Sequence, residues 1–444
     1  MSSLRLHGAG RSAALERLRA LGVPSSPELN DTAPPERDPQ PRTRRDRRAL
    51  RRAKRAARKT ILGRHPYRAA TIVVVLGLTP AWVSLGTALN DPGLGSSLSA
   101  RFAEWARGHG GGPVVVWAEN LWYSHHQPPI GGKPLKGAIP PPPSSTSSKG
   151  TSSAHLVTHL PTPARITPLA RPPIPGEGVW HPVGRKVDGL SAVYEAYLRP
   201  DTIHTSVVVG VAWMDTKLLR ATLYSGSTIP GGGPYPYTAP IAPSAAKSVV
   251  AAFNAGFLMS NANGGYYTNG HVVKPLRSGA ASLVIYRNGS ATVAEWGRDA
   301  TITSDVVAVR QNLDLLVDGG KPVPGLNAND TSKWGYTLGN QVYVWRSGVG
   351  VTSDGALVYV GGPGLNITTL AKLLVRAGAV RGMELDINTD WVNFATYDPS
   401  AASAPAGAAN GSLLLSSMTG TTARYFESWW SRDFFTMSAR GKAG

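Results

Sequence analysis

The stretch at residues 69–89 constrains this chain more than any other, because it runs for 21 positions without a charged residue. A bilayer-spanning helix needs about 20 mostly apolar residues and tolerates an internal proline such as Pro80. Residues 37–68, directly before it, hold 14 Lys and Arg but only two acidic residues. Positive residues beside a membrane helix favour the cytoplasmic side. The sequence therefore predicts an uncleaved transmembrane helix at 69–89, with a buried core helix as the alternative.

This topology describes a single-pass cell-membrane protein, with a cytoplasmic N-terminus and an extracytoplasmic C-terminal domain. A cleaved signal peptide fits less well, because the segment before the apolar run is long and no small-residue cleavage site is clear. The chain has no cysteine, which excludes disulfides, thiolate nucleophiles and cysteine metal sites. An outer domain must then be held by its core alone, which suits a bacterial envelope protein.

Residues 1–68 are predicted to form a disordered basic cytoplasmic segment, because they combine low hydrophobicity, several prolines and a dense positive run. The formal net charge of the chain is +19, and much of it lies in residues 37–68. Nucleic-acid binding by residues 37–59 is an alternative explanation of that charge. The neighbouring membrane helix explains the charge more directly, so no nucleic-acid partner is expected.

Residues 90–175 are predicted to be a juxtamembrane region followed by a stalk. Residues 98–107 have the pattern of a short amphipathic helix, and residues 113–123 are apolar and aromatic, as in a segment at a membrane surface. Between residues 128 and 175, Pro, Ser, Thr and Gly are frequent, which predicts a semi-extended spacer.

From residue 176 to 440 the sequence changes to short apolar strands and tight turns. Apolar runs at 282–286 and 291–295 flank Asn288-Gly289, which is a favoured hairpin turn. We predict an α+β domain, a mixed and largely antiparallel sheet with few helices. The helices are expected at 244–250, at 366–377 with Asn366 or Thr368 as N-cap and Gly378 as C-terminal cap, and at 425–431.

Residues 383–391 are the most informative stretch of this domain. Apolar residues at positions 383, 385 and 387 alternate with Glu384, Asp386 and Asn388, which indicates a β-strand with one buried face. A helix that leads into a strand ending in carboxylates would hold a polar site on a rigid support. The alternative is a half-exposed strand whose polar face is only solvated.

Three stretches of the domain have a distinctive order and spacing over roughly 140 residues. The stretches are Ala252-Phe253-Asn254-Ala255-Gly256-Phe257 with Gly264-Gly265-Tyr266-Tyr267 and Pro275-Leu276; Ala281 to Gly289 with Trp296-Gly297; and Val317-Asp318-Gly319-Gly320 through Gly348-Val349-Gly350 to Glu384-Leu385-Asp386. Together they resemble the phosphodiester glycosidase family, and this resemblance implies hydrolysis of a sugar-1-phosphodiester.

Cleavage of a glycosyl phosphate passes through an oxocarbenium-like state, which a nearby carboxylate stabilises. The family resemblance and the strand pattern both select Asp386 as the nucleophile, base or electrostatic stabiliser. Glu384 lies two residues away on the same predicted face and is its expected partner; a structural hydrogen-bond acceptor is the alternative role for Glu384.

Five further residues are predicted to bind substrate. Arg346 is the best phosphate ligand, because a guanidinium group matches phosphate oxygens, with a surface arginine as the alternative. Lys274 is a weaker phosphate ligand. Asn254 is predicted to bind sugar hydroxyls or to bridge backbone, Asp318 to face the site or to cap a turn, and Asn388 to extend the polar face. No spacing of His, Asp or Glu indicates a metal site, and no cofactor is predicted.

The chain also departs from the family pattern. It has Arg346-Ser347-Gly348 where the family has Arg-Thr-Ala, and residues 385–390 lack the glycine loop Leu-Asp-Gly-Gly-Gly-Ser. Two functions are therefore predicted. The first is a membrane-anchored extracytoplasmic glycosidase that hydrolyses a sugar-1-phosphodiester of a cell-envelope glycoconjugate. The alternative is a catalytically inactive module that binds cell-wall glycan or a partner protein.

Overall fold

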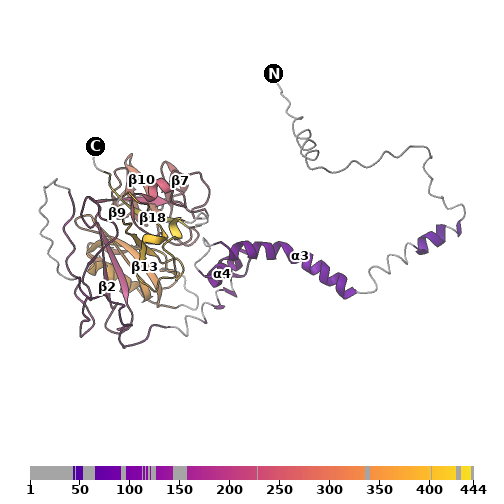
Figure 1. Ribbon diagram of the computed structural model, residues 1–444, viewed down its shortest axis with the longest axis horizontal. Helices are drawn as coiled ribbons and strands as arrows, with labels where there is room; N and C mark the ends of the chain where they lie inside the picture. Colours follow the sequence, from indigo (N-terminus) through magenta and orange to yellow (C-terminus); the bar gives the residue numbers. More distant parts are fainter. Residues whose placement is uncertain are drawn as a thin grey trace, which may run out of the picture. The chain divides into compact units, whose positions relative to one another are not determined.

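The structure is a computed structural model, in which the chain divides into two compact units, Met1–Leu78 and Thr79–Gly444 (Figure 1). Three β-sheets and most of the helices belong to the second unit. The residues that the structure describes are 44–45, 47–53, 66–91, 97–112, 114–115, 117–118, 121, 127–143, 158–227, 229–335, 341–401, 403–426 and 432–441.

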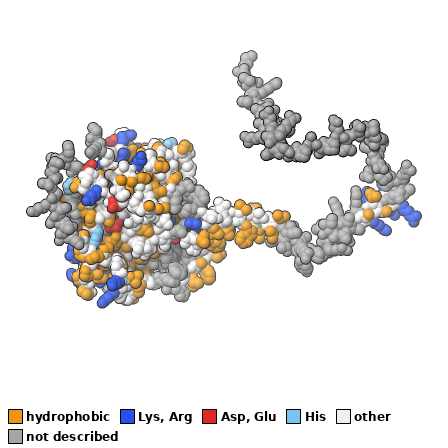
Figure 2. All heavy atoms as spheres, viewed as in Figure 1, with side chains coloured by type: hydrophobic (Ala, Val, Ile, Leu, Met, Phe, Trp, Pro, Cys, Tyr) orange, Lys and Arg blue, Asp and Glu red, His pale blue; other side chains and the backbone are white. Residues whose placement is uncertain are grey.

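Helix α3 (Pro66–Leu89) covers the uncharged stretch that was predicted to be a membrane helix. Hydrophobic side chains are exposed along its described part, and Leu76 and Trp82 are 66% and 64% exposed (Figure 2). Within the described part of the chain, no helix is both long and apolar enough to cross a membrane. The side chains of residues 66–74 and most of the predicted basic segment 1–68 lie outside the described residues.

Helix α4 (Leu98–Gly108) confirms the amphipathic helix that was predicted at 98–107. Ser97 is its N-cap, because its hydroxyl accepts a hydrogen bond from the backbone N–H of Ala100. Part of the predicted stalk, residues 158–175, lies against the sheet domain. Leu160 and Ile166 are buried there, and the Ile166 N–H donates to the Gly178 carbonyl over 2.9 Å. These apolar side chains join the core, so the stretch follows the domain surface.

The domain confirms the predicted α+β class with largely antiparallel sheets and few helices, since every strand pairing within its sheets is antiparallel. The eight-stranded sheet has the order β1 (His181–Val183), β2 (Val193–Leu198), β3 (Val209–Met214), β14 (Leu357–Leu365), β13 (Val344–Thr352), β15 (Ala379–Glu384), β11 (Leu315–Asp318) and β12 (Lys321–Pro322).

Two five-stranded sheets complete the domain. One has the order β7 (His271–Lys274), β6 (Tyr266–Thr268), β10 (Val306–Gln311), β8 (Ala281–Tyr286) and β9 (Ala291–Glu295), and β8 and β9 form the predicted hairpin. The other has the order β17 (Gly411–Leu413), β16 (Phe394–Tyr397), β5 (Val249–Asn254), β18 (Phe434–Ala439) and β4 (Leu219–Tyr224).

The main core lies between the eight-stranded sheet and the two smaller sheets. Phe253 from β5, Leu283 from β8 and Val349 from β13 are all buried in one hydrophobic cluster. Helix α7 (Ile367–Arg376) covers the other face of the eight-stranded sheet with Leu370 and Leu374. Its amphipathic pattern was predicted, and Asn366 is its N-cap, accepting from the Thr369 N–H over 2.8 Å.

The helix predicted at 244–250 is shorter than expected. Helix α6 (Pro243–Ala246) ends before residue 250, because Val249 and Val250 are buried in strand β5 of the sheet core. The predicted helix at 425–431 lies largely outside the described residues, and only the 3-10 turn η4 (Arg424–Phe426) is described; a further 3-10 turn, η3, covers Ala408–Asn410.

Candidate active site

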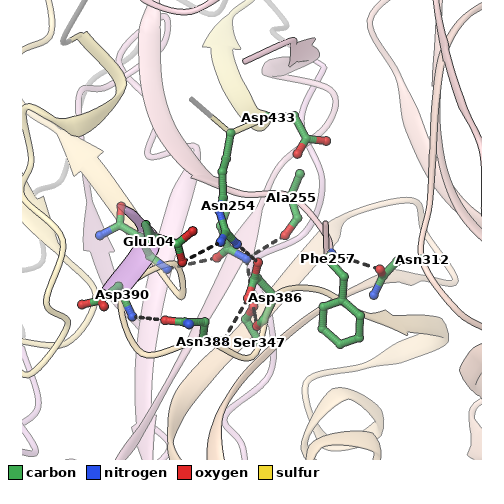
Figure 3. Close-up of polar contacts among 12 residues, drawn as sticks. Glu104, Asn254, Ala255, Phe257, Asn312, Ser347, Asp386, Asn388, Asp390 and Asp433 are labelled. Carbon is green, nitrogen blue, oxygen red and sulfur yellow. Dashed lines mark hydrogen bonds and ion pairs between the residues drawn. The ribbon is translucent and has the colours of Figure 1, made fainter. Parts of the chain in front are cut away.

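The candidate site forms where strands of two sheets end beside each other. Strand β15 ends at Glu384, and the chain continues along β13: the Leu385 N–H donates to the Ser347 carbonyl over 2.8 Å. The Asp386 carbonyl accepts from the Ser347 N–H over 3.1 Å, and the Asp386 N–H donates to the Ala255 carbonyl just beyond β5. Figure 3 shows Asp386 among these neighbours. The backbone of Asp386 is therefore fixed between two sheets.

The predicted strand 383–391 is correct only in its first part. After Asp386 the chain turns, because the Asp386 carboxylate accepts from the Asn388 N–H over 2.9 Å and the Asn388 side chain accepts from the Asp390 N–H over 2.8 Å. The alternative of a solvated polar face is wrong, since Glu384 is 0% and Asp386 only 4% exposed. Buried carboxylates are costly unless a cation or hydrogen bonds accompany them.

The cation beside Asp386 is Arg432, which precedes strand β18. Its guanidinium donates to the Asp386 carboxylate over 2.8 Å and lies 3.8 Å from the centre of the Trp391 ring. Burial raises the pKa of the Asp386 carboxyl above its usual value, while Arg432 and the Asn388 N–H oppose this shift. The indole of Trp391 fixes the guanidinium from one face, so Asp386 and Arg432 form a positioned pair of opposite charges.

Helix α4 contributes a second carboxylate to the same arginine. Glu104 accepts from the other terminal nitrogen of Arg432 over 3.4 Å, so that one guanidinium joins Asp386 and Glu104. The charge of Glu104 also raises the pKa of Asp386. A segment far upstream of the sheet strands thus contributes a side chain to the site.

Glu384 and Arg346 form a separate and fully buried ion pair. Their side chains are 0% and 1% exposed, and Arg346 donates to Glu384 over 2.5 Å. Arg346 also donates to the carbonyls of Leu365 and Trp334. Burial raises the pKa of Glu384 to about 7 despite the arginine. Arg346, predicted to bind phosphate, is here engaged with protein groups, and Glu384 lies behind Asp386 in the interior.

Asn254 occupies the centre of a buried hydrogen-bond network. Its amide nitrogen donates to the Ala255 carbonyl and the Ser347 hydroxyl, and its oxygen accepts from the Tyr359 hydroxyl and the Asn393 N–H. Both donors and both acceptor positions of the amide are thereby used. Of the two predicted roles, this geometry favours a bridge between backbone segments.

The other two predicted substrate ligands lie elsewhere. Asp318 is the last residue of β11, and this end of β11 lies beside Val380 and Arg381, near the start of β15. The Asp318 carboxylate pairs with exposed Arg298 over 2.7 Å. Six residues of extended chain separate that end from Asp386, about 20 Å. Lys274 ends β7 and donates to the Met259 carbonyl at the edge of a cavity of about 600 Å³.

Several residues of the site were not predicted from the sequence. Arg432, Glu104 and Tyr359 lie outside the motifs that were used, and Arg310 pairs with Asp433 over 2.6 Å in the interior, both 1% exposed. A buried carboxylate generally needs a cation nearby, and this rule predicts that some arginine pairs with Asp386. Nothing in the local sequence, however, shows which arginine would serve each one.

The chemistry of the site is that of a carboxylate and a guanidinium at the rim of a buried network. Within the described residues, no group of three His, Asp or Glu side chains is arranged to hold a metal ion. Asp386 offers an oxygen base and Arg432 offers donors for an anion, so the pair suits a reaction at a carbon that carries an anionic leaving group.

Comparison with known proteins relates one part of this chain to a protein family. Residues 247–386 match the family model described as phosphodiester glycosidase, a range that holds β5 to β15 and ends at Asp386. No curated protein sequence gives a significant match to the chain.

Three solved structures resemble the fold at low overall similarity. They are the zebrafish N-acetylglucosamine-1-phosphodiester alpha-N-acetylglucosaminidase catalytic domain auto-inhibited by its pro-peptide (12% identity, 58% of this chain and 87% of that one, TM-score 0.36), a hypothetical protein from Synechocystis (12%, 59% and 64%, 0.33) and a putative exported protein from Burkholderia pseudomallei (11%, 52% and 74%, 0.28). With TM-scores this low, these structures add no argument, and the similarity rests on residues 247–386, which match the model of the phosphodiester glycosidase family.

Proposed function

We propose that this chain hydrolyses a sugar-1-phosphodiester at the site around Asp386. The observation that carries the proposal is the position of Asp386 at the end of the family-matched range, with its backbone fixed between two sheets and its carboxylate on Arg432. A carboxylate positioned in this way can serve an oxocarbenium-like transition state, and a guanidinium can bind the phosphate.

In the proposed reaction, the bond between the anomeric carbon and the phosphate oxygen breaks. Both electrons of that bond leave with the phosphate monoester, and a water molecule supplies the new hydroxyl on the sugar. Asp386 accepts a proton from this water and passes it to solvent. The leaving monoester has a second pKa of about 6, so it departs without a strong general acid. Arg432 neutralises the charge that gathers on the phosphate.

Glu384 serves the site as a positioning residue in this proposal. Its side chain is fully buried against Arg346, and its carbonyl accepts from the side chain of Asn312 over 3.0 Å. The Asn312 oxygen accepts from the Phe257 N–H (Figure 3). Asn312 therefore connects Glu384 with the loop after β5. Through these contacts Glu384 holds the end of β15 from which Asp386 projects.

The test compares sugar release by the full chain and by two matched variants on a panel of sugar-1-phosphodiesters and an aryl-phosphate sugar. Asp386→Asn should lose at least about 100-fold in kcat/KM, because a positioned base contributes on that scale. Asp318→Asn is the control, since Asp318 is half-buried beside Arg298, next to the opposite end of β15. Equal turnover by wild type and Asp386→Asn would contradict the assignment of this residue. Saturable glycan binding without any release would favour the inactive binding module.

We also propose that residues 69–89 anchor the enzyme in the cell membrane with the catalytic domain outside, where a cell-envelope glycoconjugate is the substrate. The uncharged run, the positive residues before it and the exposed apolar side chains along α3 support this placement. Fusing a periplasm-active reporter enzyme to residue 441 and to residue 60 tests it. Activity of the first fusion alone is expected, and the reverse pattern would refute the orientation.

A further inference from the structure

A second polar site lies at a surface cavity of about 600 Å³. Three cationic side chains, Lys274, Arg277 and Lys333, line this cavity together with a single carboxylate, Asp314. The amide of Asn261 and the hydroxyl of Ser332 are among the other polar groups of the lining. Three cations against one carboxylate leave the cavity positively charged, and such a lining favours an anionic ligand.

The cationic groups keep donors that can reach a ligand. Asp314 is shared, since it lies 2.7 Å from Arg277 and 3.5 Å from Lys333. Lys274 donates to one backbone carbonyl, that of Met259. An ammonium group has three N–H donors, so each lysine can form further bonds to the oxygens of an anion.

The walls of the cavity are built around a buried side chain, which makes the site rigid. Gln311 is 0% exposed, and its oxygen accepts from the N–H groups of both Gly265 and Arg277 over 2.8 and 2.7 Å. Its nitrogen donates to the Arg277 carbonyl over 3.0 Å. A Cβ on Gly265 would lie 2.2 Å from the Pro275 carbonyl oxygen, so only glycine allows the two walls to approach this closely. A cavity fixed in advance loses little conformational entropy when it binds a ligand.

Two short connections join this cavity to the candidate active site. Gln311 is followed by Asn312, whose side chain donates to the Glu384 carbonyl. Lys333 is followed by Trp334, whose carbonyl accepts from Arg346 over 2.9 Å. Each connection thus leads, within one residue of the chain, to a group that contacts the Glu384–Arg346 pair next to Asp386.

We propose that this cavity binds a second phosphate group of the substrate, carried on the aglycone beyond the scissile phosphodiester. The substrate class is then a glycosyl phosphodiester with a polyanionic aglycone, such as a chain of repeated phosphodiesters. This proposal rests on the proposed function for its role in catalysis, but binding at the cavity can be measured without turnover.

The experiment titrates the full chain with an oligomer of glycerol phosphate and, separately, with inorganic phosphate. The variant Lys274→Gln/Lys333→Gln removes two cations from the cavity. The matched control Lys217→Gln/Lys372→Gln removes two exposed lysines that do not line it. The cavity variant should bind the oligomer about tenfold more weakly, because charge-assisted hydrogen bonds are lost. The control variant should bind the oligomer as tightly as wild type does. Wild type and the control variant should both bind inorganic phosphate more weakly than the oligomer.

Three results would overturn the proposal: equal oligomer affinity of wild type and the cavity variant, an equal loss in the control variant, or inorganic phosphate binding as tightly as the oligomer. Asp386→Asn separates the two proposals, since it should keep the oligomer affinity of wild type while it loses turnover. If Asp386→Asn still turns over substrate, the catalytic assignment fails and the cavity is judged on affinity alone. The cavity variant should also raise KM for an oligomeric substrate and leave KM unchanged for an aryl-phosphate sugar, whose aglycone carries no further phosphate.

Discussion

The Asp386 carboxylate accepts a hydrogen bond from the Arg432 guanidinium over 2.8 Å, in the part of the domain where β15 ends and β18 begins. This contact joins the end of the family-matched range to a residue 46 positions beyond it. The arginine opposes the effect of burial on Asp386 and thereby favours its ionised form. The following predictions depend on this pair and on the groups around it.

Replacing Arg432 by Gln should move the acidic limb of the pH profile of kcat/KM to higher pH. Without the cation, burial and Glu104 both raise the pKa of Asp386, so the base form appears only at higher pH. Phosphate affinity should fall as well, because the guanidinium donors are lost. Arg432→Lys is the control that keeps the charge, and it should show a smaller shift of the limb. An unchanged profile in Arg432→Gln would exclude Asp386 as the group that titrates.

Glu104→Gln should lower KM for a phosphodiester substrate several-fold. In the structure Glu104 takes one side of the Arg432 guanidinium, a position that a phosphate oxygen could use. The neutral amide of Gln competes less well with a phosphate oxygen for the Arg432 guanidinium. The pKa of Asp386 should also fall, because a nearby negative charge is removed. Steady-state kinetics with Glu295→Gln as a distant carboxylate control would measure this. A loss of kcat in Glu104→Gln would show instead that Glu104 takes part in the reaction.

Glu195 allows a test of the electrostatic cost of burial away from the site. It lies in β2, where its side chain accepts from the Tyr197 hydroxyl over 2.9 Å, and burial raises its pKa to about 7. The folded state then holds a proton that the unfolded state loses near pH 4.5, so this group makes stability fall as pH rises from about 4.5 to 7. Below about pH 4.5 Glu195 is protonated in both the folded and the unfolded state, so its ionisation no longer affects stability.

Glu195→Gln should therefore match wild type in its free energy of unfolding near pH 4 and exceed it above pH 7. The shift corresponds to a difference of about 3 kcal/mol, at 1.36 kcal/mol for each pH unit. Urea denaturation of both proteins across this range measures it. A constant difference at every pH would mean that the ionisation of Glu195 is the same in both states.

Much of this fold follows from local sequence patterns. The β8–β9 hairpin follows from alternation and Asn288-Gly289, and α7 from its amphipathic spacing and the cap Asn366, since these signals act within a few residues. The strand at Glu384 was found for the same reason. Its true end was missed, because it depends on the side-chain hydrogen bond between Asp386 and Asn388.

The site itself was only partly predictable. The motif around Asp386 identifies this residue as a candidate. Its partner Arg432 precedes β18, in another sheet, and no nearby sequence pattern indicates that it pairs with Asp386. Arg346 was read as a phosphate ligand because its sequence position cannot show that Glu384 lies 2.5 Å away. Pairings of buried charges depend on which strands become neighbours, and that is a property of the whole topology.

Asn254 provides the last prediction, because its two sequence-based roles have opposite consequences. As a bridge, Asn254 satisfies the Tyr359 hydroxyl and the Asn393 N–H, so Asn254→Ala should leave buried donors unpaired and lower the free energy of unfolding by about 3 kcal/mol. The exposed Asn329→Ala is a matched control and should cost little. KM should stay near the wild-type value at a temperature where the variant is folded, since all hydrogen-bonding positions of the amide face the protein. A raised KM at unchanged stability would instead mean that this side chain turns toward the sugar when substrate binds.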